Sequence, residues 1–235
     1  MIGIFDSGVG GLAALSELRI LLPREDIIYL ADTKNQPYGI KRREELLPII
    51  KGNLKLLFDM GADTVLMACC TASTLHPYLD PDERRRAVPI VQTVTECIGE
   101  CERVTVIATE YTVNTRAFTK SICKAHPHTR VTEIATQELV SLVESGLSDK
   151  SVTEGGREYL DLLAERIAAT APDALILGCT HFSHVEGELG KRLPGVTTVS
   201  PAREGARLTA KLLNKKRGAS EECSGRLTYL ATRDK

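Results

Sequence analysis

The chain has 235 residues, of which 43% are hydrophobic and 26% charged, and its formal net charge is −1. This composition is typical of a globular protein, and the length allows one large domain or two small ones. The near-zero charge gives no electrostatic basis for binding nucleic acid or a membrane surface, and the absence of Trp, with only 4% aromatic residues, argues against a base-stacking surface.

The N-terminal segment lacks the features of a targeting signal, because it carries no basic residue and reaches an acidic one at Asp6. No apolar stretch approaches the roughly 18 residues that a membrane-spanning helix needs. The chain contains seven cysteines, an odd number, and several lie in strand-like or helix-like sequence. We therefore expect a reduced, cytoplasmic protein.

Short apolar runs recur along the chain and alternate with stretches of helical periodicity. The runs that predict strands are residues 2–5, 27–30, 64–68, 90–92, 104–108, 131–134, 174–178, 196–199 and 227–230. Leucines at positions 12, 15, 18 and 22 predict a helix after the first strand, and Pro48 predicts a kink or a break in the helix after Lys41. This alternation predicts βαβ units and parallel sheets.

A glycine-rich segment, residues 6–11 (Asp-Ser-Gly-Val-Gly-Gly), follows the first strand and opens the first helix. Its glycines let backbone N–H groups approach an anion, and a helix N-terminus favours negative charge. The segment lacks the spacing of a dinucleotide-binding motif and the Lys of a P-loop, so a carboxylate or small anion is favoured over a nucleotide. A tight turn without any ligand is the alternative.

Two segments, residues 63–69 and 173–179, share one layout. In each, an Asp leads into a short apolar run, and a cysteine follows six residues after that Asp. Such runs are typical of buried parallel strands, so Cys69 and Cys179 are expected at strand C-termini, where open α/β sheets bind ligands. One thiol on each side of a small molecule can take a proton from one face of a carbon while the other returns one to the opposite face.

The similarity between these segments extends to residues 2–7 and 104–109, where a short strand runs into a small hydroxyl residue each time. Two similar halves that face one another are one interpretation. Two unrelated buried strands are the other, in which Cys69 and Cys179 only pack in the core, since free Cys is among the most buried residue types.

Polar residues directly after each cysteine favour a functional interpretation. Thr71 and Thr180 offer hydroxyl groups, and the adjacent turns offer N–H groups suited to a carboxylate. His181 stands two residues after Cys179, where it can exchange a proton with that thiol. A metal held by the cysteines and His181 is the chemical rival, but the Cys-x-x-Cys spacing of structural sites is missing, so no metal site is predicted.

Four sequence blocks occur in the order and spacing of a known family. They are residues 6–12, residues 30–33 with Pro37-Tyr38-Gly39, residues 68–72 around Cys69, and residues 177–182 around Cys179. Together they resemble the glutamate racemases of the aspartate/glutamate racemase superfamily, and the resemblance runs from residue 2 to about residue 231.

The resemblance implies two similar α/β domains with mostly parallel sheets, related by pseudo-twofold symmetry, with the active site in the cleft between them. Residues 1–94 and 197–235 would form the first domain and residues 95–196 the second. The implied activity is the interconversion of L- and D-glutamate without a cofactor, which supplies D-glutamate for peptidoglycan. A homodimer is compatible with the resemblance.

The resemblance also implies roles for single residues. Cys69 and Cys179 would be the acid/base thiols, Asp6 and His181 would flank them, and Glu144 matches an acidic position near the second thiol. The implied substrate-binding positions are Ser7, Pro37, Tyr38, Gly39, Cys70, Thr71 and Thr180.

Departures from the family pattern cluster near these positions. Cys70 replaces an Asn that follows the first cysteine, and Ala135-Thr136-Gln137 replaces a Cys-Pro pair. A missing amide removes a hydrogen bond to a charged group, worth roughly 1.5 to 3 kcal/mol. Two alternatives therefore remain beside glutamate racemisation: a racemase for aspartate or another small acidic compound, and a thiol-based binding protein without catalysis.

Overall fold

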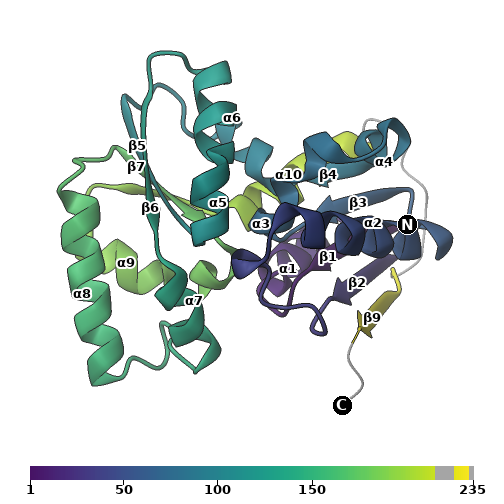
Figure 1. Cartoon of the computed structure of the whole chain (residues 1–235), viewed down its shortest axis with the longest axis horizontal. Helices are drawn as coiled ribbons and strands as arrows, with labels where there is room; N and C mark the ends of the chain where they lie inside the picture. The colour runs from purple at the N-terminus through teal and green to yellow at the C-terminus, as the bar shows by residue number, and fades with distance from the viewer. Residues whose placement is uncertain (215–224, 233–235) are drawn as a thin grey trace.

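The computed structural model describes residues 1–214 and 225–232, and in this part of the chain the strands form two parallel sheets (Figure 1). The first sheet has the order β4-β3-β1-β2-β9, with β1 (Ile2–Asp6), β2 (Ile27–Ala31), β3 (Thr64–Met67), β4 (Ala87–Pro89) and β9 (Leu227–Ala231). The second has the order β6-β5-β7-β8, with β5 (Arg103–Ala108), β6 (Arg130–Ala135), β7 (Ala174–Gly178) and β8 (Thr197–Val199).

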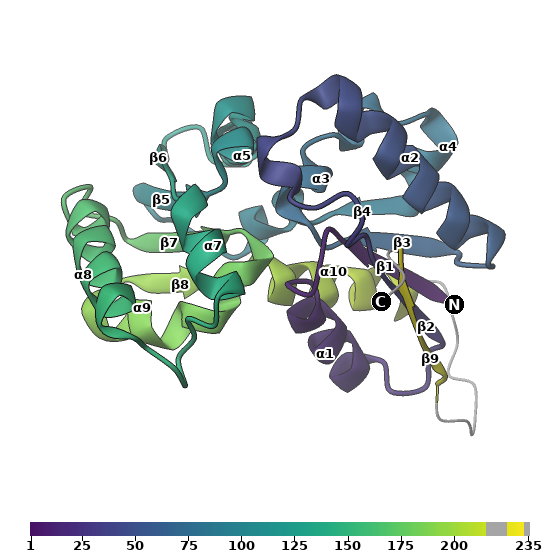
Figure 2. The same ribbon diagram turned by 60° about the horizontal axis from the view of Figure 1, so that its bottom comes forward.

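Helices connect the strands and cover the sheets. In the first half they are α1 (Leu12–Leu21), η1 (Tyr38–Ile40), α2 (Arg43–Asp59), α3 (Cys70–Ser73), η2 (His76–Tyr78), α4 (Pro81–Arg86) and η3 (Ile90–Glu96). In the second they are α5 (Glu110–Thr115), α6 (Ala117–Ala125), α7 (Gln137–Glu144), α8 (Glu154–Ala168), η4 (Thr180–Val185) and α9 (Glu186–Arg192). The chain then returns through α10 (Pro201–Asn214), which lies between the two sheets (Figure 2).

Among the residues that the structure describes, the core contains three apolar clusters, and the central one joins the halves. It combines buried residues of both sheets, such as Ile4 and Ile176, with Ala206 of α10. A second cluster lies between the first sheet and α2, and a third between the second sheet and helices α7 to α9. Arg203 of α10 adds ion pairs to Glu17 and Glu186, one in each half. The halves are therefore held together by packing as well as by the chain.

The mixed α/β fold with two parallel sheets is confirmed. The strand expected at residues 90–92 is wrong: this segment is η3, and β4 pairs with β3 just before it. Ile90, Val91 and Val94 are apolar because they face the central cluster, not because they extend a strand. The expected break at Pro48 is also absent, since α2 is a single 17-residue helix whose buried Leu and Ile side chains hold it against the sheet.

One expected domain boundary needs correction. Residues 197–199 were assigned to the first domain, but they form β8 and pair with β7 in the second sheet. The crossing back to the first half therefore follows β8 and coincides with α10. Of the same segment, residues 215–224 and 233–235 lie outside the described residues. The boundary between residues 94 and 95 stays a prediction.

The described cysteines are free thiols, and the seventh, Cys223, lies outside the described residues. Across residues 1–214 and 225–232, no helix combines the length and apolar character needed to traverse a bilayer.

Candidate active site

The two sheets bring the predicted cysteines to one cavity. Cys69 follows β3 and stands directly before α3, while Cys179 follows β7 and stands directly before η4. Both line the same space between the halves, which we call the thiol cavity. Its lining residues are Ser7, Gln36, Pro37, Tyr38, Gly39, Cys69, Cys70, Thr71, Thr109, Gln137, Val140, Glu144, Cys179, Thr180 and His181.

Cys69 lies in the first half, buried beside Ser7 and Asp6. Its Sγ donates to Ser7 Oγ over 3.6 Å. Burial raises the pKa of the Cys69 thiol to about 12, with a smaller contribution from the negative charge of Asp6, while N–H groups of Ser7 and Ala72 act in the opposite direction. Once deprotonated, such a thiolate is a stronger base than an exposed one.

Cys179 has a histidine partner in the second half. The Sγ of Cys179 and the Nδ1 of His181 are 3.7 Å apart, and His181 Nε2 lies 3.3 Å from Glu144 Oε1. Burial is the main cause that raises the pKa of Cys179. Glu144 thus holds the imidazole ring in position, and the ring can pass a proton to or from the sulfur.

Asp6 connects the two halves at the base of the cavity. Its fully buried carboxylate accepts hydrogen bonds from Gly8 N–H at 2.9 Å and from the Thr180 hydroxyl at 3.1 Å. Burial raises the pKa of Asp6, while the charge of His181 and these hydrogen bonds oppose the rise. The contact is close as well as polar: a Cβ on Gly10 would lie 2.5 Å from Thr180 Oγ1.

Three threonine hydroxyls form a cluster across the cleft. Thr71 Oγ1 lies 3.1 Å from Thr109 Oγ1 and 3.2 Å from Thr112 Oγ1, and the latter two are 2.9 Å apart. Thr71 belongs to α3, whereas Thr109 and Thr112 lie at the start of α5. The cluster therefore places several hydroxyl donors beside Cys70, whose buried side chain also lines the cavity.

Tyr38 is buried, and its hydroxyl is hydrogen-bonded to Asp32 and Asn53. It donates to Asp32, and Asn53 Nδ2 donates to Tyr38 Oη at 3.0 Å and to Asp32 Oδ2 at 3.1 Å. Burial and the Asp32 carboxylate raise the pKa of Tyr38, so it stays a neutral anchor. What this segment offers the cavity is the Tyr38 ring with Pro37 and Gly39.

Residues 35–209 match the sequence profile of the family described as Asp/Glu/Hydantoin racemase. The chain belongs to this family. It is 36% identical to the glutamate racemase of Desulforudis audaxviator over 232 residues, which cover 95% of the chain and 82% of that protein. It is 33% identical to the glutamate racemase of Carboxydothermus hydrogenoformans, over 99% of the chain and 87% of that protein.

Solved racemases have the same fold. A glutamate racemase from Francisella tularensis, crystallised with D-glutamate, matches with a TM-score of 0.88 and 26% identity over 100% of this chain and 88% of that one. A glutamate racemase from Bacillus anthracis matches with a TM-score of 0.89 and 25% identity, over 100% of this chain and 89% of that one. An aspartate racemase from Picrophilus torridus matches with a TM-score of 0.67 and 17% identity, over 90% of this chain and 93% of that one. At this identity the match shows a shared fold alone.

All the predicted site residues except Asp6 line the thiol cavity, and Asp6 lies directly behind it through Thr180. Residues that the sequence analysis missed are Gln36, Thr109, Gln137 and Val140. A signal existed for some of them. Thr109 ends the segment that matched residues 2–7, and the 137, 140 and 144 positions share one face of a helix.

The thiol cavity is small, with a volume of about 20 Å³, close to the space that one water molecule needs. A wider cavity of about 520 Å³ adjoins it, because Gln36, Glu144 and His181 line both. Any organic substrate therefore requires the walls of the thiol cavity to move apart, and the wider cavity offers a route to it.

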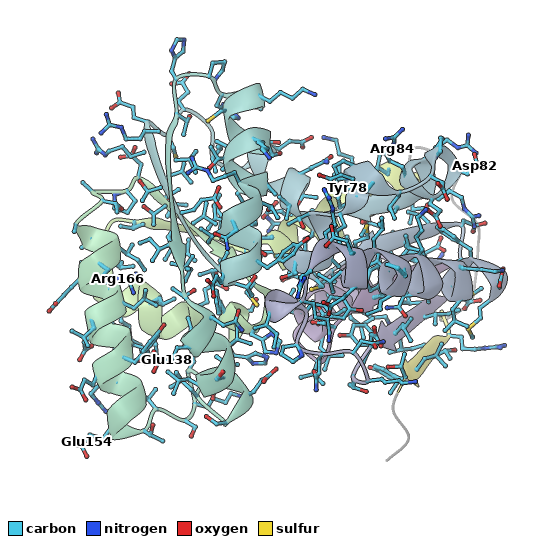
Figure 3. The ribbon with its side chains drawn as sticks, viewed as in Figure 1. Tyr78, Asp82, Arg84, Glu138, Glu154 and Arg166 are labelled. Carbon is cyan, nitrogen blue, oxygen red and sulfur yellow. The ribbon has the colours of Figure 1, made fainter. Side chains whose placement is uncertain are left out.

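No Lys or Arg is among the described residues that line the thiol cavity. The charged side chains labelled in Figure 3 lie elsewhere: Asp82 and Arg84 are exposed on α4, and Glu154 and Arg166 are exposed on α8. Among the described residues, no group of three or more His, Cys, Asp or Glu side chains is arranged to hold a metal ion.

Proposed function

We propose that the chain interconverts L- and D-glutamate, with Cys69 and Cys179 as the acid/base pair and without a cofactor. The observation that carries the proposal is that two thiols, delivered by strands of two different sheets, line one cavity. Glutamate is the favoured substrate because relatives at 33% to 36% identity over nearly the whole chain are glutamate racemases.

In each turnover one sulfur begins as thiolate and the other as thiol. The thiolate removes the α-proton, and the electron pair of the C–H bond stays on the substrate carbon, next to the carboxylate. The opposite thiol then donates its proton to the other face of that carbon. The two sulfurs end with exchanged protonation states, and the reverse reaction restores them.

The surrounding groups make this proton transfer feasible. Burial of both thiols raises their pKa values, which strengthens the thiolate that attacks a weakly acidic C–H bond. His181, held by Glu144, can exchange a proton with Cys179, while Ser7 and Asp6 lie beside Cys69. The hydroxyl of Thr71, together with backbone N–H groups, can stabilise the charge that develops on the carboxylate.

D-glutamate made in this way would supply peptidoglycan synthesis, and we propose that role together with a cytoplasmic location. The aspartate racemase of Picrophilus torridus shares the fold at 17% identity, so a change of substrate within this architecture is the second candidate.

The test measures two readouts on purified protein. Loss of the α-proton signal in D₂O, followed by NMR, reports proton abstraction from L-glutamate or L-aspartate, and circular dichroism reports racemisation. We expect exchange and racemisation with glutamate, and loss of racemisation in Cys69→Ala and in Cys179→Ala. Cys123→Ala is the matched control, because its half-buried thiol on α6 lies outside the thiol cavity.

Retained racemisation in either active-site variant would overturn the two-thiol mechanism. Exchange with aspartate and not with glutamate would establish the second candidate. No exchange with either amino acid would favour a binding protein.

A further inference from the structure

Gln137 carries a buried polar atom with no protein partner, directly at the thiol cavity. Its Oε1 is one of two buried side-chain atoms without a hydrogen bond among the described residues. The other, Glu133 Oε2, belongs to a carboxylate that Thr119 N–H binds through Oε1 at 3.0 Å. Gln137 has no such compensation, and a buried unsatisfied group costs about 1 to 3 kcal/mol. A buried group with this cost calls for an explanation, and a ligand that binds at the cavity is one.

The position of Gln137 follows from the start of α7. It is the first residue of that helix, and Val140 and Glu144 lie on the same face and line the same cavity. Across the cleft stands Gly39, where a Cβ would lie only 2.8 Å from Gln137 Oε1 and 3.0 Å from the side chain of Thr109. The absence of a side chain at residue 39 therefore makes room for the amide group.

The contacts of Gln137 differ from those of the two sulfurs. Cys69 is hydrogen-bonded to Ser7, and Cys179 lies against His181, whereas Gln137 packs against Gly39 and Thr109. A substrate whose α-carbon lies between the sulfurs would extend its side chain towards this second group of residues. For glutamate, that side chain ends in a carboxylate.

We propose that Gln137 is a specificity-determining residue whose carboxamide hydrogen-bonds the side-chain carboxylate of the substrate. The inference rests on the proposed function and names the residue that recognises the distal group. The thiol cavity has no lysine or arginine among its described lining residues, so apart from His181 the donors that can bind the two carboxylates of glutamate are neutral. A half-turn of the terminal amide places Nε2 where Oε1 now lies, and Nε2 donates two hydrogen bonds.

The test compares Gln137→Leu and Gln137→Glu with the parent protein in the glutamate racemisation assay. Leu keeps the approximate size and removes the hydrogen bond, so KM for glutamate rises tenfold to a hundredfold while kcat changes less. Glu keeps the shape but adds a negative charge next to the substrate carboxylate, so KM rises further. Gln92→Leu is the matched control, because Gln92 is exposed on η3 and lies outside the thiol cavity.

Each outcome decides the question. Unchanged KM in Gln137→Leu, with an active parent protein, would overturn the proposal and leave the proposed function intact. A lower KM in Gln137→Glu would show that the amide oxygen faces the substrate ammonium instead, and would also overturn it. A parent protein without activity on glutamate would overturn both. Thermal unfolding of each variant separates a folding defect from lost binding, and we expect Gln137→Leu to unfold at or above the parent temperature, because it removes an unsatisfied buried atom.

Discussion

Replacement of Gly10 by alanine tests whether catalysis needs the close contact between the halves. The new Cβ would lie 2.5 Å from Thr180 Oγ1, whereas ordinary contact begins at 3.4 Å, so Thr180 must retreat by about 0.9 Å. Thr180 also donates to Asp6 and directly follows Cys179, so the retreat displaces the second thiol and its neighbours. Overpacking of this kind costs about 1 to 3 kcal/mol of stability.

The expected effect on activity is larger than the effect on folding. A displacement near 1 Å in a catalytic arrangement reduces rates about a hundredfold, so kcat/KM for glutamate racemisation should fall by that factor in Gly10→Ala. Circular dichroism measures the rate, and urea denaturation measures the free energy of unfolding. Gly52→Ala is the control, since nothing lies within 4 Å of its Cβ on α2, and it should stabilise the protein by about 0.5 to 1 kcal/mol. Full activity in Gly10→Ala would refute the reasoning.

Three further predictions concern charge and protonation at the site. Burial raises the folded-state pKa of Asp6 above 3.8, so the free energy of unfolding falls as pH rises from 3.8 towards the raised pKa. Asp6→Asn should remove this pH dependence and increase stability near neutral pH. A variant whose urea unfolding shows the pH profile of the parent protein would contradict this. The pKa of Cys69 is raised to about 12, so its rate of alkylation by iodoacetamide, measured by mass spectrometry, should rise about tenfold per pH unit and still be rising at about pH 10. A rate that reaches its plateau at the pH where an ordinary thiol does would disprove the shift. Glu144→Gln removes the partner of His181 Nε2 and should lower kcat/KM about tenfold from either enantiomer, whereas an unchanged value would limit the ion pair to a structural role.

Much of the fold could be predicted from the sequence because its signals are local. Buried parallel strands have continuous apolar runs, as residues 64–67 and 174–178 show, and the helices between them carry a 3.6-residue period. Residues 90–92 misled the prediction because a short apolar run has the same appearance in a strand and in a 3₁₀ helix that packs on a core. Residues 197–199 belong to the second domain because they pair with β7, and such a long-range contact leaves no local signal in the sequence.

The sequence by itself determined that Cys69 and Cys179 each follow a buried apolar strand and precede residues rich in hydrogen-bond donors. Only the tertiary structure decided that both sulfurs line one cavity, that Thr180 reaches Asp6 across 174 positions of sequence, and that Gln137 approaches Gly39. The physical reason is that strand ends follow from local hydrophobic pattern, whereas contacts between two halves follow from how α10 and the shared central cluster pack them together.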